Sequence, residues 1–534
     1  MKNQGQSLVK GSLILLIANF LVKIIGAAFK IPLTNLLGNE GMGYFNAAYN
    51  IYAGLFVIAT AGLPVAVSKM VSAAGQSGST KEMKRIFNIA YILFLIIGIS
   101  GSCVLFFGAD GLAATTKYEN SNIAIKTIAP AILFVSLMSV YRGFFQGMSD
   151  MIPTAVSEVA EAAAKLVIGY IAAYLLFSYG LPVAASGAVF GVTMGTLLSF
   201  AVLMLIHLRK KKYIYSDIAH SKPARSYGKI TWELVKIAVP VTISASVFTL
   251  TNMIDYVMIG RNLESVKQYL SDTPVALYGM YTSKAVVLYN MPPTLVMSLC
   301  LALVPAISRA YTAGDKRTVR ATTTQSLKCT LIFAVPCCVG LAVLASPILN
   351  LLYGTNDAQT LLQLISPAVV FVSLVLVSNA ILQATGHVTA PVINIAFGGI
   401  AKVIVNNILV SHPSININGA PVGTVLCYFI YMFLNLIQVY RITKAEMGIS
   451  FWLKPILSGA VMAVVAFFVY AYAGPAFGGS KAEIILSLAV SGGISGIAYL
   501  LSLIGTGGIS KEDILVLPKG DKIAALFVKI KLIK

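Results

Sequence analysis

The sequence predicts an all-α polytopic membrane protein, with fourteen transmembrane helices that form two parallel six-helix repeats around a central cavity plus two C-terminal helices. Three observations predict it: the composition, the placement of cations between apolar stretches, and an internal repeat. Of the 534 residues, 57% are hydrophobic and only 11% are charged. A soluble domain carries roughly 25% charged residues, so a water-soluble globular protein is excluded.

Apolar stretches long enough to cross a bilayer follow one another along the chain. One crossing needs about 20 mostly apolar residues. The first stretch is too long for a signal peptide and lacks a small-residue cleavage site, so we interpret it as a span. The expected spans are 11–36, 44–68, 86–108, 124–148, 153–178, 182–207, 231–259, 278–308, 323–345, 361–384, 389–411, 419–440, 453–473 and 483–505.

Lys and Arg residues alternate with these spans. The even-numbered loops and the two termini hold 27 of them, Arg142 included, whereas the odd-numbered loops hold only 4, namely Lys117, Arg261, Lys267 and Lys481. Because cytoplasmic loops carry the excess of cations, both termini are expected in the cytoplasm. The net charge of +20 is then a consequence of topology next to anionic membrane lipids, and no nucleic acid is needed to explain it.

The two halves of the chain repeat short motifs in the same order. Gln146-Gly147-Met148 with Pro153 corresponds to Gln383-Ala384-Thr385 with Pro391, and Gly187-Ala188 corresponds to Gly419-Ala420. Six spans separate the copies, so the repeats are parallel, and paired repeats of this kind commonly enclose a central site. The expected domains are an N-terminal lobe (1–210), a cytoplasmic linker (211–229), a C-terminal lobe (230–441), two appended helices (442–505) and a basic cytoplasmic tail (506–534).

The basic tail has two open interpretations. Its apolar residues among lysines fit an amphipathic helix at the membrane surface, and they fit a solvated cytoplasmic end equally well.

Signatures of an enzyme are missing from the sequence. The six cysteines and four histidines show no metal-ligand spacing, and there is no P-loop or nucleophile elbow. We therefore expect a transporter without a catalytic residue, metal or cofactor.

Five lysines are predicted within the spans and cannot easily reach water. Each costs about 2.5–3.5 kcal/mol at the centre of a membrane helix, so they should face a wet cavity or one another. Only three acidic residues lie at comparable depth, which makes the interior net positive. The lysines are Lys23, Lys30, Lys165, Lys284 and Lys402, and the acids are Glu158, Glu161 and Asp255.

Lys23 and Lys284 have no acid three or four residues away, so they are the first candidates for contact with an anionic substrate, followed by Lys30. Glu161 and Lys165 lie four residues apart and form either an ion pair or a ligand contact.

Two further groups keep two interpretations each. Lys402 with Asn406 is either part of the cavity or a helix-packing cluster. Asp255 with Asn252 is an ion site or a partner for a lysine.

Prolines and glycines interrupt three predicted spans and are candidate hinges for alternating access. Gly62 and Pro64 lie in the second span, Pro240 in the seventh, and Pro292 with Pro293 in the eighth. Proline frees backbone groups that protein or cavity water must satisfy, although ordinary kinks have the same cause.

The chain resembles the MurJ-type lipid flippases of the MOP exporter superfamily, and within it the branch with stage V sporulation protein B-like polysaccharide transporters. The resemblance rests on Lys23-Ile24-Ile25-Gly26, on Phe144-Phe145-Gln146-Gly147-Met148 through Pro153-Thr154, on Ser283-Lys284, and on Leu303-Val304-Pro305. In that family, basic residues of spans one and eight line a cationic cavity, which carries over to Lys23 and Lys284 and less closely to Lys30. The Gram-negative members use mainly arginines there, and their second-span arginine has no counterpart here.

The resemblance implies a flippase in the bacterial cytoplasmic membrane that moves lipid II, an undecaprenyl-diphosphate-linked peptidoglycan precursor, from the inner to the outer leaflet. Its partners would be the polyprenyl-diphosphate lipid and cell-wall synthesis enzymes, and the membrane potential is a candidate energy source. The alternatives are a flippase for a capsular, teichoic or spore-related glycan, a cation-coupled multidrug antiporter of the same superfamily, and a membrane scaffold for cell-wall enzymes.

Overall fold

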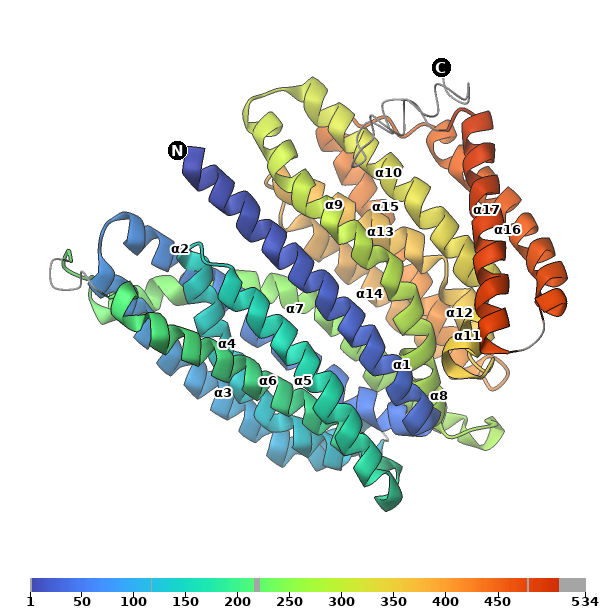
Figure 1. The fold of residues 1–534 in the computed structure, drawn as a ribbon, viewed down its shortest axis with the longest axis horizontal. Coiled ribbons are helices and arrows are strands. Elements are labelled where there is room, and N and C mark those ends of the chain that lie inside the picture. Colours follow the sequence, from blue (N-terminus) through green and yellow to red (C-terminus); the bar gives the residue numbers. More distant parts are fainter. Residues whose placement is uncertain (1, 117, 216–220, 478–479, 509–534) are drawn as a thin grey trace. The chain divides into compact units, whose positions relative to one another are not determined.

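Helices make up every regular element in the described part of the chain, as predicted. A computed structural model describes residues 2–116, 118–215, 221–477 and 480–508 (Figure 1). Residues 509–534 lie outside this part, so the amphipathic helix considered for the basic tail stays a prediction. The chain divides into two compact units, residues 1–283 and 284–534. The predicted lobes 1–210 and 230–441 rest on the sequence repeat and stay a prediction.

The described residues of the first unit form eight α-helices, with short 3₁₀ turns between some of them at Glu119–Ser121, Phe177–Tyr179 and Lys267–Tyr269. The helix α4 packs against α2, α3 and α6, while α5 packs against α6 and α1. The helices are α1 (Lys2–Thr60), α2 (Gly62–Gln76), α3 (Thr80–Thr116), α4 (Asn122–Gly147), α5 (Ile152–Leu176), α6 (Leu181–Ile214), α7 (Tyr227–Ser265) and α8 (Pro274–Met280).

The helix α1 is two helices joined at a glycine. Gly38 has φ 66° and ψ −172°, outside the helical region, and lies between the first two predicted spans. Glycine adopts positive φ without the clash that a Cβ atom causes in other residues. The chain can therefore turn sharply here and begin the next helix at once.

The second predicted span is broken at the expected place. The helix α1 ends at Thr60, and α2 begins at Gly62. A Cβ atom on Gly62 would lie 2.1 Å from the Ala238 carbonyl oxygen and 2.3 Å from Thr242 Oγ1, both on α7. The absence of a side chain thus lets α2 and α7 pack with their backbones in close approach.

The linker after α6 is fastened to the start of α3. The Arg225 guanidinium forms ion pairs with Glu82 (2.7 Å) and with Glu233, and the hydrogen bond from Arg225 to Glu82 raises the pKa of Arg225. Arg85 donates to the Arg225 carbonyl oxygen at 2.8 Å. These contacts hold the described part of the linker, from residue 221, against α3.

Nine α-helices lie in the part of the second unit that the structure describes. Asp315 caps α10 by accepting hydrogen bonds from the Thr318 hydroxyl and backbone N–H, and these bonds lower the pKa of Asp315. The helices are α9 (Val286–Thr312), α10 (Lys316–Val343), α11 (Ala345–Tyr353), α12 (Gln359–Ile365), α13 (Ala368–Ala384), α14 (Ala390–Leu409), α15 (Gly419–Thr443), α16 (Ile449–Phe477) and α17 (Lys481–Gly505).

The helix α13 has the central place in the second unit. It packs against α9, α10 and α15, while α14 packs on α15 and the final pair α16–α17 on α10 (Figure 1).

Eleven stretches of the described residues are long and apolar enough to cross a membrane. One of them, Ile17–Gln76, covers both the first and the second predicted span. The helices α7 and α9 coincide with the seventh and eighth predicted spans without being among the eleven. The multi-pass membrane architecture is confirmed, and the number fourteen stays a prediction.

The α-helices of the seventh and eighth predicted spans continue past their prolines, and the hinge role of these prolines stays a prediction. The helix α7 continues through residue 240, and α9 continues through Pro292 and Pro293. The helical pattern of the eighth span changes earlier, at a π-helix over Tyr281–Ala285 between α8 and α9. Pro292 and Pro293 lie inside α9, where proline cannot donate a backbone hydrogen bond to the preceding turn.

The close approach of α2 and α7 gives a test of this packing. We expect Gly62→Ala to lower the free energy of unfolding by about 1–3 kcal/mol, the usual cost of overpacking, because the new methyl group meets backbone. The control is Gly108→Ala on α3, where nothing lies within 4 Å of a Cβ atom. Thermal unfolding of the purified variants measures this, and an equal melting temperature for Gly62→Ala and Gly108→Ala would contradict it.

Candidate functional site

The first unit contains a cluster of charged and hydroxyl side chains on three helices. Arg142 on α4 forms ion pairs with Glu161 at 3.1 Å and Glu158 at 4.0 Å, both on α5. Its guanidinium also donates to Ser157 Oγ (3.3 Å) and Ser199 Oγ (3.1 Å), the latter on α6. We call these five residues the arginine cluster.

The place of Arg142 corrects the prediction, which counted this residue among the loop cations. Its side chain is 12% exposed and lies within α4. The predicted span 124–148 already contained it, so the sequence carried the signal. An ion pair of Glu161 with Lys165 was one expectation, but among the described residues the salt bridge of Glu161 is to Arg142.

Two lysines of the first unit share one tyrosine ring. The Lys30 ammonium of α1 lies 6.0 Å from the centroid of Tyr49, and the Lys165 ammonium of α5 lies 5.5 Å from the same centroid. Tyr49 also stacks on the buried Phe45. The ring attracts both cations through its negative face, and we call Lys30 and Lys165 the lysine pair. Tyr49 was not singled out from the sequence.

The second unit pairs Lys284 with an acid distant in sequence. The Lys284 ammonium donates to both carboxylate oxygens of Asp357 at 2.7 Å and to Thr355 Oγ1 at 2.9 Å. It also lies 5.8 Å from the Tyr353 ring centroid. The sequence showed no acid three or four residues from Lys284, and its acidic partner lies 73 residues away. The contact of Lys284 with an anionic substrate stays a prediction.

The other predicted site residues lie apart from these groups. Lys23 is exposed on α1, and Asp255 is half-buried on α7. Lys402 is 2% exposed, and both it and Asn406 lie against Gly423 of α15; both interpretations of Lys402 stay predictions. The side chains of Pro240 and Asn252 on α7 lie outside the described part.

The second unit also holds an uncharged polar cluster that sequence reasoning missed. Asn435 on α15 accepts from Asn394 of α14 (2.8 Å) and donates to Asn379 of α13 (2.7 Å), which in turn donates to Tyr431 (2.9 Å). Interhelical amides of this kind join membrane helices. These residues lie on three different helices, so their spacing in the sequence does not show that they contact one another.

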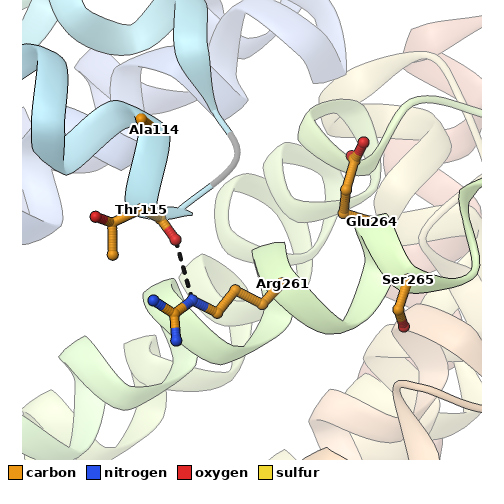
Figure 2. A pocket seen from close by; sticks show the side chains of 5 residues that line it. All are labelled: Ala114, Thr115, Arg261, Glu264 and Ser265. Atoms are coloured by element: carbon orange, nitrogen blue, oxygen red, sulfur yellow. Dashed lines mark hydrogen bonds between the residues drawn. The ribbon is translucent and has the colours of Figure 1, made fainter.

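A surface pocket of about 470 Å³ lies in the first unit between the end of α3 and α7 (Figure 2). Arg261 donates to the Thr115 carbonyl oxygen at 3.1 Å, while Glu264 and Ser265 lie further along the wall. None of the predicted site residues lines this pocket. Among the described residues, no group of three His, Cys, Asp or Glu side chains could hold a metal ion.

Two protein-family models match this chain. The model of the family described as "Polysaccharide biosynthesis protein" matches residues 8–311, more than half of the chain, and the MatE model matches residues 240–408. The chain belongs to the polysaccharide biosynthesis protein family.

Two curated relatives and one solved structure agree with this family. Lipid II flippase MurJ of Bacillus subtilis (strain 168) is 26% identical over 82% of this chain and 83% of its own length. Stage V sporulation protein B of the same organism is 25% identical over 86% of this chain and 88% of its own length. A structure of lipid II flippase MurJ in an inward closed conformation has a TM-score of 0.68 at 15% identity, covering 91% of this chain and 98% of the other.

The resemblance inferred from the sequence is thereby confirmed, and so is the expectation of a transporter rather than an enzyme, since proteins of this superfamily are transporters and flippases.

The arginine cluster gives a test of buried charge compensation. Arg142→Met leaves Glu158 and Glu161 without their cation, and breaking one side of a buried ion pair costs about 3–5 kcal/mol. We expect a clear drop in melting temperature, and no drop for Arg209→Met, an exposed arginine near the end of α6. If Arg142→Met has the same melting temperature as the native protein, the arginine cluster does not stabilise the first unit.

Proposed function

We propose that this protein moves an undecaprenyl-diphosphate-linked glycan from the inner to the outer leaflet of the bacterial cytoplasmic membrane. The cargo we expect first is lipid II, because one relative is named a lipid II flippase. A capsular, teichoic or spore-related glycan on the same carrier is the alternative, since the other relative is named for sporulation.

The lysine pair is the observation that carries the proposal. Two ammonium groups face one ring, and like charges in a partly buried place repel each other. Glu161 is engaged by Arg142, so it does not compensate the pair fully. A diphosphate would supply the missing negative charge through charge-assisted hydrogen bonds. Lys23 lies on the same helix as Lys30 and offers a third cation along α1.

Lysine fits a mobile anion better than a fixed one. Its ammonium is a point charge on a flexible stem, whereas arginine binds bidentately in a rigid geometry. A headgroup that must be released again on the far side is held by charge without a fixed orientation. The polyprenyl tail would stay in the lipid, and alternating access of two lobes would carry the headgroup.

The membrane potential is the energy source that we propose for this movement. A mobile charge gains about 2.3 kcal/mol per 100 mV. The cytoplasmic termini expected from the cations give the orientation of the protein in the membrane. The coupling ion is left open. Cell-wall synthesis enzymes, which use the externalised precursor, are the partners that we expect.

A cation-coupled multidrug antiporter is the second candidate, favoured by the MatE match over residues 240–408. Such an antiporter would need acids to hold a cation, and Glu158, Glu161 and Asp255 are the candidates, the first two of which are paired. The ion pairs of Glu158 and Glu161 with Arg142 argue against that use of these two. Drug-dependent flux of protons or sodium in proteoliposomes would support the antiporter instead.

Flipping of fluorescent lipid II in proteoliposomes tests the proposal. We expect transport by the native protein and an at least tenfold lower rate in the double variant Lys30→Met/Lys165→Met, which keeps the apolar stems but removes both charges. The double variant Lys30→Arg/Lys165→Arg should retain more activity than the methionine variant. Lys126→Met, which removes an exposed lysine paired with Asp110, is the matched control.

Equal flipping by the methionine variant and the control would contradict the role of the lysine pair. If the native protein moves a different undecaprenyl-diphosphate glycan but not lipid II, the mechanism stands and the alternative cargo is correct.

A further inference from the structure

The helical pattern of the eighth predicted span changes around Lys284, which itself lies in a π-helix. The π-helix Tyr281–Ala285 separates α8 from α9, and single turns of this kind are frequent at functional sites. Asn46 of α1 donates to Ser283 Oγ at 2.6 Å and to Thr282 Oγ1 at 3.0 Å. The second unit begins at Lys284. The side chains of the two residues before this lysine thus bond to α1 of the first unit, while the Lys284 side chain bonds to residues of the second unit.

All three hydrogens of the Lys284 ammonium have acceptors in the second unit. Two donate to the carboxylate oxygens of Asp357 and one to Thr355 Oγ1. The ammonium side chain is only 5% exposed, whereas the Asp357 side chain is 32% exposed. Water can therefore reach the carboxylate side of this pair much more readily than the ammonium side.

The two partners would lose unequal amounts on separation. Asp357 precedes α12, and its Oδ1 accepts further hydrogen bonds from Thr355 Oγ1 (2.8 Å) and from the Ala358 N–H (3.0 Å). These bonds and water would satisfy the carboxylate without Lys284. The ammonium has no such access to water, and an unpaired buried charge is costly. Asp357 can therefore leave at low cost only if another anion takes its place on Lys284.

We propose that Asp357 is an internal stand-in for the substrate phosphate, which a diphosphate displaces from Lys284. This inference rests on the proposed function and adds a specificity-determining residue to it. A diphosphate carries more negative charge and more acceptor oxygens than one carboxylate, so it competes for the ammonium, whereas a singly charged headgroup does not. Displacement also frees residues 354–358 from Lys284. Asp357 thus selects for highly charged headgroups.

Pyrophosphate binding to the purified full-length protein at constant ionic strength tests the proposal. We expect Asp357→Asn to bind pyrophosphate about tenfold more tightly than the native protein, because the competing charge is gone. Lys284→Met should bind at least tenfold more weakly. Asp110→Asn removes the acid of a different ion pair, the one with Lys126, and should bind pyrophosphate like the native protein. Unchanged or weaker binding by Asp357→Asn would overturn the proposal.

Hydrogen exchange on the native protein decides the matter if Asp357→Asn fails to fold. Saturating pyrophosphate should speed exchange at the amides of residues 354–359, since these residues lose their tie to Lys284, and Lys284→Met should show no such change. Unchanged exchange in the native protein would overturn the proposal.

The outcomes separate this proposal from the transport function. Tighter pyrophosphate binding by Asp357→Asn without flipping of any lipid would leave Asp357 as a stand-in and refute the flippase. Flipping by the native protein without tighter binding would refute the stand-in alone.

Discussion

A charged side chain inside an apolar body needs a partner of opposite charge, because the low dielectric makes its isolation costly. Both units of this protein meet this requirement with residues that lie far apart in sequence. Arg142 gathers two glutamates of α5 in the first unit, and Lys284 meets Asp357 in the second. The helices are held in place by these contacts as well as by packing. Where compensation is incomplete, as at the lysine pair, the protein has capacity for an external anion.

This balance connects the structure with transport. A carrier whose cations were fully and rigidly paired would have no use for an anionic headgroup, and one with bare cations would be unstable when empty. Lys30 and Lys165 lie over Tyr49, which stabilises them partly, and Lys284 has a carboxylate that is accessible to water. In our account the empty protein uses its own groups as partners, and the diphosphate replaces them during transport.

The sequence predicts the helical architecture well and the site only in part. Apolar length and cation placement locate most helices because the bilayer imposes both, and the break before Gly62 was recognised from a Gly-Leu-Pro motif. The partner of Lys284 was missed since Asp357 lies 73 residues away, and local spacing cannot reveal a tertiary contact. Pro292 and Pro293 lie inside α9, whose helical backbone continues past them. Arg142 shows the opposite error, because its span was predicted but its charge was assigned to a loop.

The most direct test of the central claim is a cryo-EM structure of the protein with an undecaprenyl-diphosphate glycan bound. We expect phosphate oxygens within about 4 Å of lysine ammonium groups, at Lys30 and Lys165 or at Lys284, with Asp357 separated from any lysine that the phosphate occupies. Headgroup density remote from all of these lysines, with Lys284 still bound to Asp357 and no anion at the lysine pair, would contradict the account.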